Sequence, residues 1–436
     1  MSSQSQQGSK LDISSITHPL ASFTYENEVY QAGLKGQRPS ITFDCLEWET
    51  LVKDRLSADS YGYVWGSAGT RETDDNNKKA FKRWGIVSSR LVKSGFPDLK
   101  TTLFGETFDY PIAMAPVGVQ RIFHPDGETA SAKAAEQEHV TYILSTASAT
   151  SIEDVAKANG NGSRWYQLYW PLNENNDITV SLLSRAKAAG YKVLVVTLDT
   201  YILGWRPSDL NNAFNPFIRA DDIGVALGFS DPVYRHQFQE KHGKPIEEDV
   251  QTAATEWAHT VFPGVSHGWE DLKFLQEHWD GPIVLKGIQT VADAKRAVDY
   301  GIQGIVVSNH GGRQQDGCIA SLDVLPEIVD AVGDDLEIIF DSGVRCGADI
   351  VKALALGAKM VLIGLPYIYG LALQGEHGVS HVLKSLLGDF NLNLHLSGIT
   401  SVSPEHLNRS VLRRTETENS TTRRYVENCF YTIRIY

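Results

Sequence analysis

Short apolar runs alternate with longer stretches of helical spacing beyond residue 105, and this alternation constrains the fold more than any other feature. A short, continuously apolar run is typical of a parallel strand that is buried on both faces. Eight such runs occupy residues 111–115, 141–145, 165–169, 192–197, 282–286, 304–308, 337–341 and 359–364. Most of the gaps are rich in Ala, Lys and Glu, for example residues 128–137, 180–189, 291–299 and 348–356.

Strands that alternate with helices predict βαβ units and a parallel sheet. Because eight units close a (β/α)₈ barrel, we predict an α/β fold of the TIM-barrel type. An open, doubly wound sheet is the alternative, but that fold does not require eight strands. It would also be expected to carry a GxGxxG fingerprint after an early strand, and the sequence has none there.

The segments around the predicted barrel have different characters. Residues 21–100 are mostly helical in pattern, with an amphipathic helix at 48–56 that Ser57 to Ser60 would break. The aromatic and glycine-containing run at 61–66 is predicted to be a compact turn. The gap at 205–281 is far longer than the others, and it follows the fourth strand. We predict that this insertion lies over the active face of the barrel.

These patterns predict one domain with two extensions. The polar residues 1–20 are expected to be disordered, and residues 21–415 to form the catalytic domain, with its barrel from about residue 105. Residues 416–436 have a mixed polar and aromatic character and are predicted to be a tail of no evident role.

Charge and cysteine usage narrow the partners. The formal net charge of −13 argues against nucleic acid or an anionic membrane as the main partner. The four cysteines are scattered, which predicts a reducing compartment and no metal site of the CxxC type. No apolar segment resembles a signal peptide or a bilayer span. We therefore expect a soluble cytoplasmic protein.

Polar residues follow the predicted strands at their carboxyl ends. In a barrel these ends converge on a single site. Polar side chains are disfavoured on buried strands unless they are paired, so the set implies a sizeable polar ligand. The set comprises Pro116, Val117, Gly118, Ser145, Gln167, Tyr169, Thr197, Asp199, Lys286, Ser308, Asp341, Ser342, Gly343, Val344, Arg345 and Gly364.

The heptapeptide Ser308 to Gln314, which reads SNHGGRQ, follows the sixth predicted strand. Its glycines allow backbone to approach a ligand closely. An imidazole such as that of His310 exchanges a proton near neutral pH, and the guanidinium of Arg313 can bind a carboxylate with two hydrogen bonds. A base beside a carboxylate-binding group indicates proton abstraction from an acid substrate, with Asp199 orienting the imidazole.

The remaining strand ends suggest the identity of a cofactor. Gly343, Gly364 and Arg345 suit a phosphate group. Ser145, Gln167, Thr197 and Lys286 could hydrogen-bond a flat heterocycle, and the lysine could stabilise negative charge on it. Flavin mononucleotide (FMN) satisfies both requirements.

Plainer interpretations stay open for several of these residues. Gln167 and Tyr169 could be a core pair, and Thr197 is a common strand residue. Asp199 could contact a helix N-terminus, and Tyr63 could serve packing alone. Lys286 is harder to explain in this way, because buried lysine is rare unless it is paired.

With these motifs in place, the chain resembles the FMN-dependent α-hydroxy acid oxidases and dehydrogenases, and within them it is most similar to the lactate 2-monooxygenases. SNHGGRQ looks like their active-site signature, and the resemblance runs from about Tyr25 to Thr415. It also rests on APVGV at 115–119, LDT at 198–200, GWRP at 204–207 and LKGIQ at 285–289.

The resemblance implies a role for each matching residue. His310 would be the base, and Arg313 and Arg206 would bind the substrate carboxylate with help from Tyr63. Tyr169 would contact the hydroxyl or keto oxygen. Backbone at Pro116, Val117 and Gly118 would lie against the flavin ring. The isoalloxazine and ribityl groups would contact Ser145, Gln167, Thr197, Lys286 and Ser308, and the ribityl and phosphate groups Asp341, Ser342, Gly343, Val344, Arg345 and Gly364.

One position departs from the family pattern. Relatives typically read Ile-Gly-Arg-Pro at the eighth strand end, whereas residues 363–366 here read Ile-Gly-Leu-Pro. Leu365 cannot donate a hydrogen bond to phosphate, which predicts weaker FMN retention.

The predicted activity is oxidation of a small L-2-hydroxy acid, with O₂ as the electron acceptor. If the keto acid stays beside the peroxide, lactate would give acetate, CO₂ and water, and Gly118 and the long insertion favour this outcome. If the keto acid leaves first, the products would be keto acid and hydrogen peroxide. A different FMN-barrel chemistry and a non-catalytic paralogue are the other classes. The resemblance also implies a homo-oligomer, a tetramer or larger.

Overall fold

The fold is a closed barrel of eight parallel strands, and the TIM-barrel prediction is therefore confirmed. The computed structural model describes residues 21–93 and 95–415, so the predicted disordered N-terminus and the C-terminal tail lie outside the described residues. The closed sheet has the order β10-β11-β4-β5-β6-β7-β8-β9. Pairing of β11 with β4, with Ile363 opposite Met114, closes the sheet and rules out an open doubly wound arrangement. The strands are β4 (Ile112–Met114), β5 (Thr141–Ser145), β6 (Arg164–Tyr169), β7 (Leu194–Thr197), β8 (Ile283–Ile288), β9 (Gly304–Val307), β10 (Glu337–Phe340) and β11 (Met360–Ile363).

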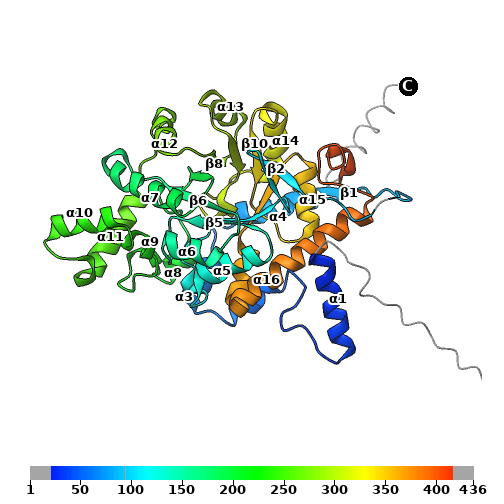
Figure 1. Ribbon diagram of the computed structural model, residues 1–436, viewed down its shortest axis with the longest axis horizontal. Helices are drawn as coiled ribbons and strands as arrows, with labels where there is room; N and C mark the ends of the chain where they lie inside the picture. Colours follow the sequence, from blue (N-terminus) through cyan, green and yellow to red (C-terminus); the bar gives the residue numbers. More distant parts are fainter. Residues whose placement is uncertain (1–20, 94, 416–436) are drawn as a thin grey trace, which may run out of the picture.

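Helices surround the barrel, as Figure 1 shows. Local sequence fixes where several of them start: the Ser151 side chain caps α6 and the Thr290 side chain caps α13, each by accepting a backbone N–H. The outer helices are α5 (Gly127–Gln137), α6 (Ile152–Asn159), α7 (Asn176–Ala188), α12 (Leu272–His278), α13 (Val291–Asp299), α14 (Ser321–Val332), α15 (Gly347–Ala355) and α16 (Leu365–Leu396). The long α16 kinks at Gln374 and Gly375, whose dihedral angles are not helical.

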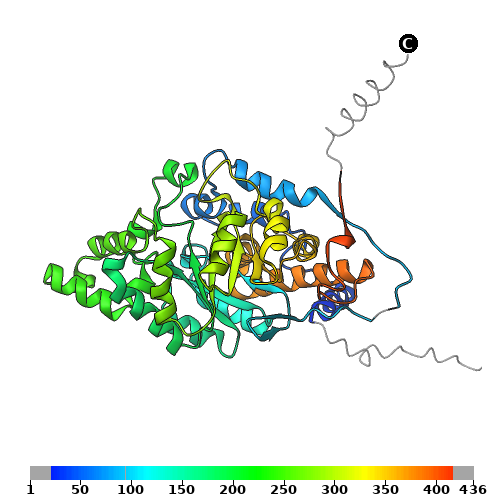
Figure 2. The ribbon, with the colours of Figure 1, turned by 90° about the horizontal axis from the view of Figure 1, so that it is seen from above.

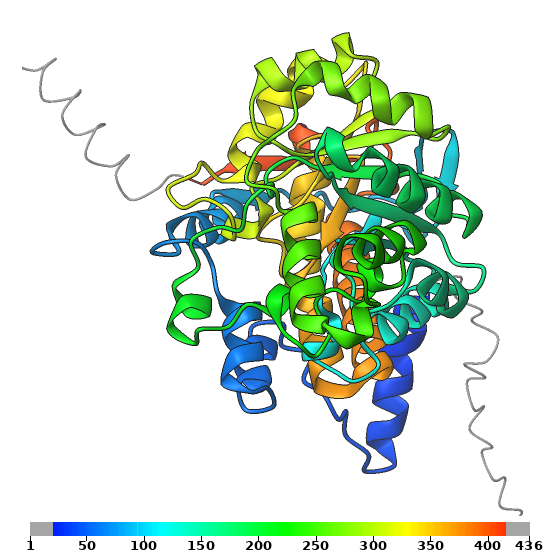
Figure 3. The same cartoon turned by 90° about the vertical axis from the view of Figure 1, so that its left-hand side faces the viewer.

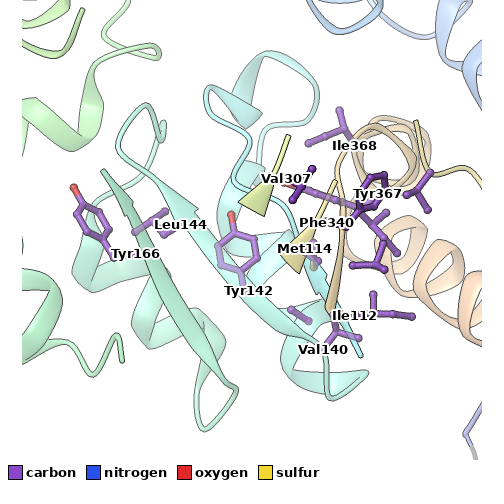
Figure 4. Packing of buried hydrophobic residues seen from close by; sticks show 14 of the residues in the cluster. Ile112, Met114, Val140, Tyr142, Leu144, Tyr166, Val307, Phe340, Tyr367 and Ile368 are labelled. Atoms are coloured by element: carbon purple, nitrogen blue, oxygen red, sulfur yellow. The ribbon is translucent and has the colours of Figure 1, made fainter. Parts of the chain in front are cut away.

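Alternate residues of each strand face two separate cores. One cluster of buried residues, which includes Ala113, Ile143, Val195 and Leu362, fills the inside of the barrel. The other includes the intervening residues and packs against the helices. Figure 4 shows part of this outer core, in which Met114, Tyr142 and Phe340 lie close to Tyr367 of α16.

A hairpin closes the amino end of the barrel. Strands β2 (Thr101–Leu103) and β3 (Glu106–Phe108) pair antiparallel, and Leu103 and Phe108 belong to the inner core. The rings of Phe104 and Phe108 meet the Trp165 ring edge-on, with centroids 5.9 and 6.0 Å apart. Ligand access is therefore left to the opposite, carboxyl end.

The N-terminal segment is helical, as predicted, but one of its local predictions is wrong. It consists of α1 (Ala21–Leu34), α2 (Trp48–Lys53), α3 (Ala58–Trp65) and α4 (Glu72–Lys82), and it ends in β1 (Trp84–Ile86), which pairs with β12 (Leu412–Arg414). Residues 61–66 were predicted to be a turn, yet 61–65 lie inside α3. The Ser57 side chain caps this helix, and Gly62 serves close packing: a Cβ there would lie 2.5 Å from the Asn212 side chain.

The predicted insertion follows the fourth barrel strand and is largely helical. It contains α8 (Pro207–Asn211), α9 (Ala226–Phe229), α10 (Pro232–His242) and α11 (Val250–Val261), with a 3₁₀ turn η4 at Pro216–Ile218. Its helices extend to one side of the barrel in Figures 1 and 2, and Figure 3 views the molecule from that side. Within the described part of the chain, every helix is too short or too polar to cross a membrane.

Candidate active site

A cavity opens at the carboxyl ends of the barrel strands, and its empty space is about 1040 Å³ with the mouth included. Most of the residues predicted from the strand ends line it. They are Tyr63, Pro116, Val117, Gly118, Tyr169, Arg206, Lys286, His310, Arg313, Asp341, Ser342, Gly343, Val344, Arg345 and Gly364. Ser145, Gln167, Thr197, Asp199 and Ser308 lie behind this wall and contact the lining residues or one another.

His310 and Asp199 form a hydrogen-bonded pair at the cavity wall. His310 Nδ1 lies 2.7 Å from Asp199 Oδ1, and the Thr200 hydroxyl donates to the same carboxylate oxygen at 2.7 Å. Burial lowers the pKa of His310 below its usual 6.5, although the nearby Asp199 opposes this shift. Burial alone would raise the pKa of Asp199, but His310 and Lys286 hold it below its usual range. The pair is therefore a neutral imidazole oriented by a carboxylate, with Nε2 as the ring nitrogen opposite Asp199.

Thr200 was not predicted as a site residue, although it is buried and lines the cavity. Its hydroxyl also lies 3.1 Å from His310 Nδ1. Its place directly after Asp199 was the signal that could have identified it.

The backbone next to Asp199 leaves room for the carboxylate. Strand β8 has a register shift between Lys286 and Ile288, and Gly287 within it has a φ of +106°. A Cβ on Gly287 would lie 2.9 Å from Asp199 Oδ2. This oxygen is buried and has no hydrogen-bond partner among the described residues. Glycine at 287 therefore allows Asp199 to lie against the strand.

Two arginines lie close to the Tyr63 ring. The guanidinium carbons of Arg206 and Arg313 are 5.8 and 5.2 Å from the ring centroid. Arg313 donates to the carbonyl oxygens of Val64 and Gly66, while Arg206 donates to the Arg313 carbonyl and to Gln314. Burial and the neighbouring Arg206 lower the pKa of Arg313 to about 10. Two like charges in a secluded cavity favour an anionic ligand between them.

The carboxylate of Asp209 only partly neutralises the positive charge of these two arginines. Asp209 Oδ2 is 3.9 Å from Arg206 Nη1, and burial raises the pKa of Asp209. Tyr169, on the same cavity wall, also has a raised pKa because it is buried, so its phenol keeps its proton. It can therefore donate a hydrogen bond to a ligand oxygen.

A buried polar network lies beneath the cavity floor. The Ser145 hydroxyl donates to Gln167 Oε1 at 3.0 Å, and Gln167 Nε2 donates to Thr197 Oγ1 at 2.9 Å. Gln167 therefore pairs with its neighbours on adjacent strands, and not with Tyr169 as a core pair would. Lys286 Nζ lies 3.0 Å from Ser308 Oγ and 3.3 Å from Asp341 Oδ2. Burial lowers the pKa of Lys286, but Asp341 and Asp199 outweigh burial and raise it, so the ammonium keeps its charge.

Two hydrogen bonds from side chains fix the backbone of the loop after β4. Tyr367 donates to the Ala115 carbonyl at 2.9 Å, and Gln120 donates to the Val117 carbonyl at 3.0 Å. A Cβ on Gly118 would lie 2.6 Å from the Ala147 Cβ. Glycine at 118 is thus required for packing against Ala147, and its role in the product outcome stays a prediction.

The end of the cavity at β10 and β11 is built from a glycine-containing turn. Ser342 and Gly343 have φ values of +85° and +87°, and the Ser342 hydroxyl accepts the backbone N–H of Gly311 at 3.0 Å. Arg345, Gly364 and Leu365 line this end, and Gly364 precedes the first turn of α16. The opposite end of the cavity has an aromatic wall that was not predicted by residue: Phe123, Phe217 and Phe262, the last two from the insertion.

A second cavity lies on the other side of β7 and β8, between residues of the insertion and the barrel. Trp170 stacks on His267 there with ring centroids 3.8 Å apart, and Thr200 lines both cavities. The buried arginines and lysine of the first cavity are not part of its lining. The first cavity is therefore the candidate active site.

Comparison with known proteins agrees with this geometry. The family model described as FMN-dependent dehydrogenase matches residues 52–414. An FMN-dependent alpha-hydroxy acid dehydrogenase of Schizosaccharomyces pombe is 65% identical over 393 residues, which cover 90% of this chain and 97% of that protein. An L-lactate oxidase of Lysinibacillus sphaericus is 41% identical, over 81% of this chain and 89% of that protein. A crystal structure of mandelate oxidase with (S)-4-hydroxymandelic acid superposes on this chain with a TM-score of 0.74 at 34% sequence identity. The superposition covers 86% of this chain and 100% of the mandelate oxidase chain.

The cavity suits the family cofactor. Lys286 is a buried cation beside the polar network and is suited to stabilise negative charge on a reduced flavin ring. The turn at Ser342 and Gly343 offers backbone N–H groups beside Arg345 for a phosphate. A matching family model over most of the chain, high identity to FMN-dependent relatives and a cavity that fits the cofactor lead to one conclusion: the chain belongs to the FMN-dependent α-hydroxy acid dehydrogenase family and is a flavin-dependent oxidoreductase.

Proposed function

We propose that this protein oxidises a small L-2-hydroxy acid and passes the electrons to O₂. We further propose that its reaction is that of a lactate 2-monooxygenase. The observation that carries the proposal is the convergence of the His310–Asp199 pair and the two arginines on one cavity. A carboxylate between Arg206 and Arg313 places the neighbouring carbon of the substrate within the same cavity as the base.

Each group then has a task that its environment supports. Arg313 and Arg206 bind the substrate carboxylate with help from Tyr63, whose ring lies close to both guanidinium groups. Tyr169 donates to the hydroxyl oxygen, because burial keeps its phenol protonated. His310 takes a substrate proton on Nε2, and Asp199 stabilises the imidazolium that forms. FMN, when bound, accepts the two electrons.

The two ends of the cavity would hold different parts of FMN. Backbone at Pro116, Val117 and Gly118 would lie against the isoalloxazine ring, and Lys286 would stabilise negative charge on it. The ring and ribityl chain would be held from behind the wall by Ser145, Gln167, Thr197 and Ser308. The ribityl and phosphate groups would be held by Asp341, Ser342, Gly343, Val344, Arg345 and Gly364.

Two product outcomes compete. Enclosure of the cavity by Phe217 and Phe262 of the insertion supports retention of the keto acid until peroxide attacks it, which gives acetate, CO₂ and water from lactate and O₂. The identity to an L-lactate oxidase supports the alternative, in which keto acid and hydrogen peroxide are released.

One experiment separates these possibilities. The purified yellow protein is mixed anaerobically with L-lactate, and bleaching of the flavin absorbance is expected in the wild type. His310→Asn should retain FMN but bleach at least about 100-fold more slowly, since a positioned base contributes roughly that much. In air, CO₂ without peroxide supports the monooxygenase outcome, and stoichiometric peroxide contradicts it. A flavin that L-lactate and larger 2-hydroxy acids all fail to bleach contradicts the catalytic proposal.

The assembly, the location and the domain limits are also proposals. We propose a homo-oligomer, a tetramer or larger, which works in the cytoplasm, where scattered thiols stay reduced. We further propose that residues 21–415 make up the catalytic domain, since β12 near the end of that range pairs with β1. Light scattering coupled to size exclusion measures the assembly.

A further inference from the structure

Asp74, an acidic residue that the predicted site does not include, lines the cofactor cavity. It lies in the first turn of α4, and its side chain is only 5% exposed. It shares the cavity with Gly343, Gly364 and Arg345, the residues proposed to hold the phosphate. A buried carboxylate at the end of a cavity that receives a dianion requires an explanation.

The Asp74 carboxylate forms ion pairs with three cationic side chains. Its Oδ2 lies 2.8 Å from Arg71 Nη2 and 2.9 Å from Lys78 Nζ, and its Oδ1 lies 3.9 Å from Arg345 Nη2. Arg71 is also held elsewhere, because it donates to the Trp65 carbonyl and stacks over the Trp65 ring at 3.8 Å. Arg345 has the loosest contact of the three, so it is the cation that can most easily change partner.

The same end of the cavity has Leu365 where a second donor to phosphate would be expected. Within the described residues, Arg345 is the guanidinium that lines this end. We infer that Asp74 competes with the FMN phosphate for Arg345, so that the local balance of Asp74, Lys78 and Arg345 sets how tightly this protein holds its cofactor. The inference rests on the family cofactor and does not depend on the substrate or on the product outcome.

The direction of the effect follows from the charges. With Asp74 ionised, Arg345 must divide its interaction between a carboxylate and the phosphate, and the carboxylate also repels the phosphate. Lys78 draws Asp74 away from Arg345, because it occupies the carboxylate from the other side. Loss of the Asp74 charge should therefore tighten FMN binding, while loss of the Lys78 charge should weaken it.

The test measures binding of FMN and of riboflavin, which lacks the phosphate, to the full-length protein by equilibrium ultrafiltration and flavin fluorescence. Asp74→Asn should lower the Kd for FMN by roughly threefold to tenfold and leave the Kd for riboflavin unchanged. Asp75→Asn is the matched control, since Asp75 is the exposed neighbour on the same helix and carries the same charge. The difference between the two variants should shrink at high salt.

A second pair keeps the inference testable if Asp74→Asn does not fold. Lys78→Gln should raise the Kd for FMN and not that for riboflavin, whereas Lys79→Gln, on the exposed side of α4, should change neither appreciably. Equal effects of Asp74→Asn on FMN and riboflavin would show a purely structural role and overturn the inference. So would an FMN affinity that Lys78→Gln and Lys79→Gln change alike.

Discussion

At the scale of single residues, the charge state of His310 depends on opposing influences. Burial, Lys286 and Arg206 favour the neutral ring, and Asp199 favours the protonated one. Burial prevails, so the imidazole stays neutral and able to accept a proton at pH 7. The hydrogen bond from Thr200 to Asp199 keeps the carboxylate from turning away.

This balance predicts the pH dependence of the reaction. Because the pKa of His310 lies below 6.5, the acidic limb of kcat/KM, along which the base becomes protonated, should have its midpoint below pH 6.5. Asp199→Asn removes the group that raises this pKa and should shift the acidic limb to still lower pH, with a lower plateau. Stopped-flow measurement of flavin reduction between pH 4.5 and pH 8 provides the profile. An acidic limb centred above 6.5 would contradict the assignment.

Individual site residues were predictable from sequence where they stand at strand ends. His310, Lys286 and Arg345 fall into this class, because a barrel gathers its strand ends regardless of loop structure. Asp74 and Phe262 do not, since Asp74 lies in α4 and Phe262 directly follows α11, and the approach of these helices to the cavity depends on tertiary packing. The start of α4 is a polar run that reads ETDDNNKK, and in such a run a buried carboxylate cannot be distinguished from its exposed neighbours by pattern alone.

At the scale of elements, the bulge in β8 decides how Asp199 approaches His310. Gly287→Ala would place a Cβ 2.9 Å from Asp199 Oδ2 at a φ of +106°. We expect a loss of about 1–3 kcal/mol in the free energy of unfolding and a larger fractional loss in the rate of flavin reduction. Urea titration and anaerobic reduction measure the two effects. Gly301→Ala is a useful control, because Gly301 also has positive φ but its nearest neighbour is 3.9 Å from the added Cβ; reduction at the wild-type rate in Gly287→Ala would refute the role of the bulge.

The first turn of α16 bears on cofactor retention. Leu365 lines the cavity at this turn, where an arginine would add a charged hydrogen bond to phosphate. Leu365→Arg should therefore tighten FMN binding by roughly ten- to hundredfold, which corresponds to about 1.5–3 kcal/mol. Titration of the flavin-free protein with FMN measures the change. An unchanged or weaker affinity would show that the turn does not present residue 365 to the phosphate.

Most strands and outer helices were predictable from sequence to within a few residues, because buried parallel strands have a strong apolar signal. The strand at 141–145 and the helix at 291–299 agree with the prediction at both ends. Helix α3 was missed because Gly62 and the aromatic residues suggested a turn, although the glycine serves contact with Asn212. The only sequence signal of the β8 bulge is a glycine. A glycine within an apolar strand does not by itself predict a shift in register.

At the scale of the whole molecule, the barrel could be predicted by counting strands, whereas the path of the insertion could not. The insertion folds through contacts between residues far apart in its own sequence, such as Phe217 with Phe262 at a centroid distance of 5.0 Å. Such contacts have no periodic signature in the sequence.

Cofactor binding should stabilise the whole fold, since the cavity draws on strands from every part of the barrel. Addition of FMN at about 100 times its Kd to the flavin-free protein should add about 2.7 kcal/mol to the free energy of unfolding. Thermal denaturation at a series of FMN concentrations should show a Tm that rises steadily with concentration. A Tm that does not respond to FMN would mean that the cofactor does not bind the folded barrel under these conditions.

The pairing of β1 with β12 has a consequence for the evolution of such enzymes. Trp84 and Arg414 are partners in this small sheet, and the Arg414 guanidinium lies 5.8 Å from the Trp84 ring. The span that holds the barrel thus starts and finishes at one point on its surface. A domain whose two ends lie close together can be inserted into a loop of another protein without distorting the fold of that protein. The barrel span is therefore suited to gene fusion, provided that the preceding helices, which supply Tyr63 and Asp74 to the cavity, accompany it.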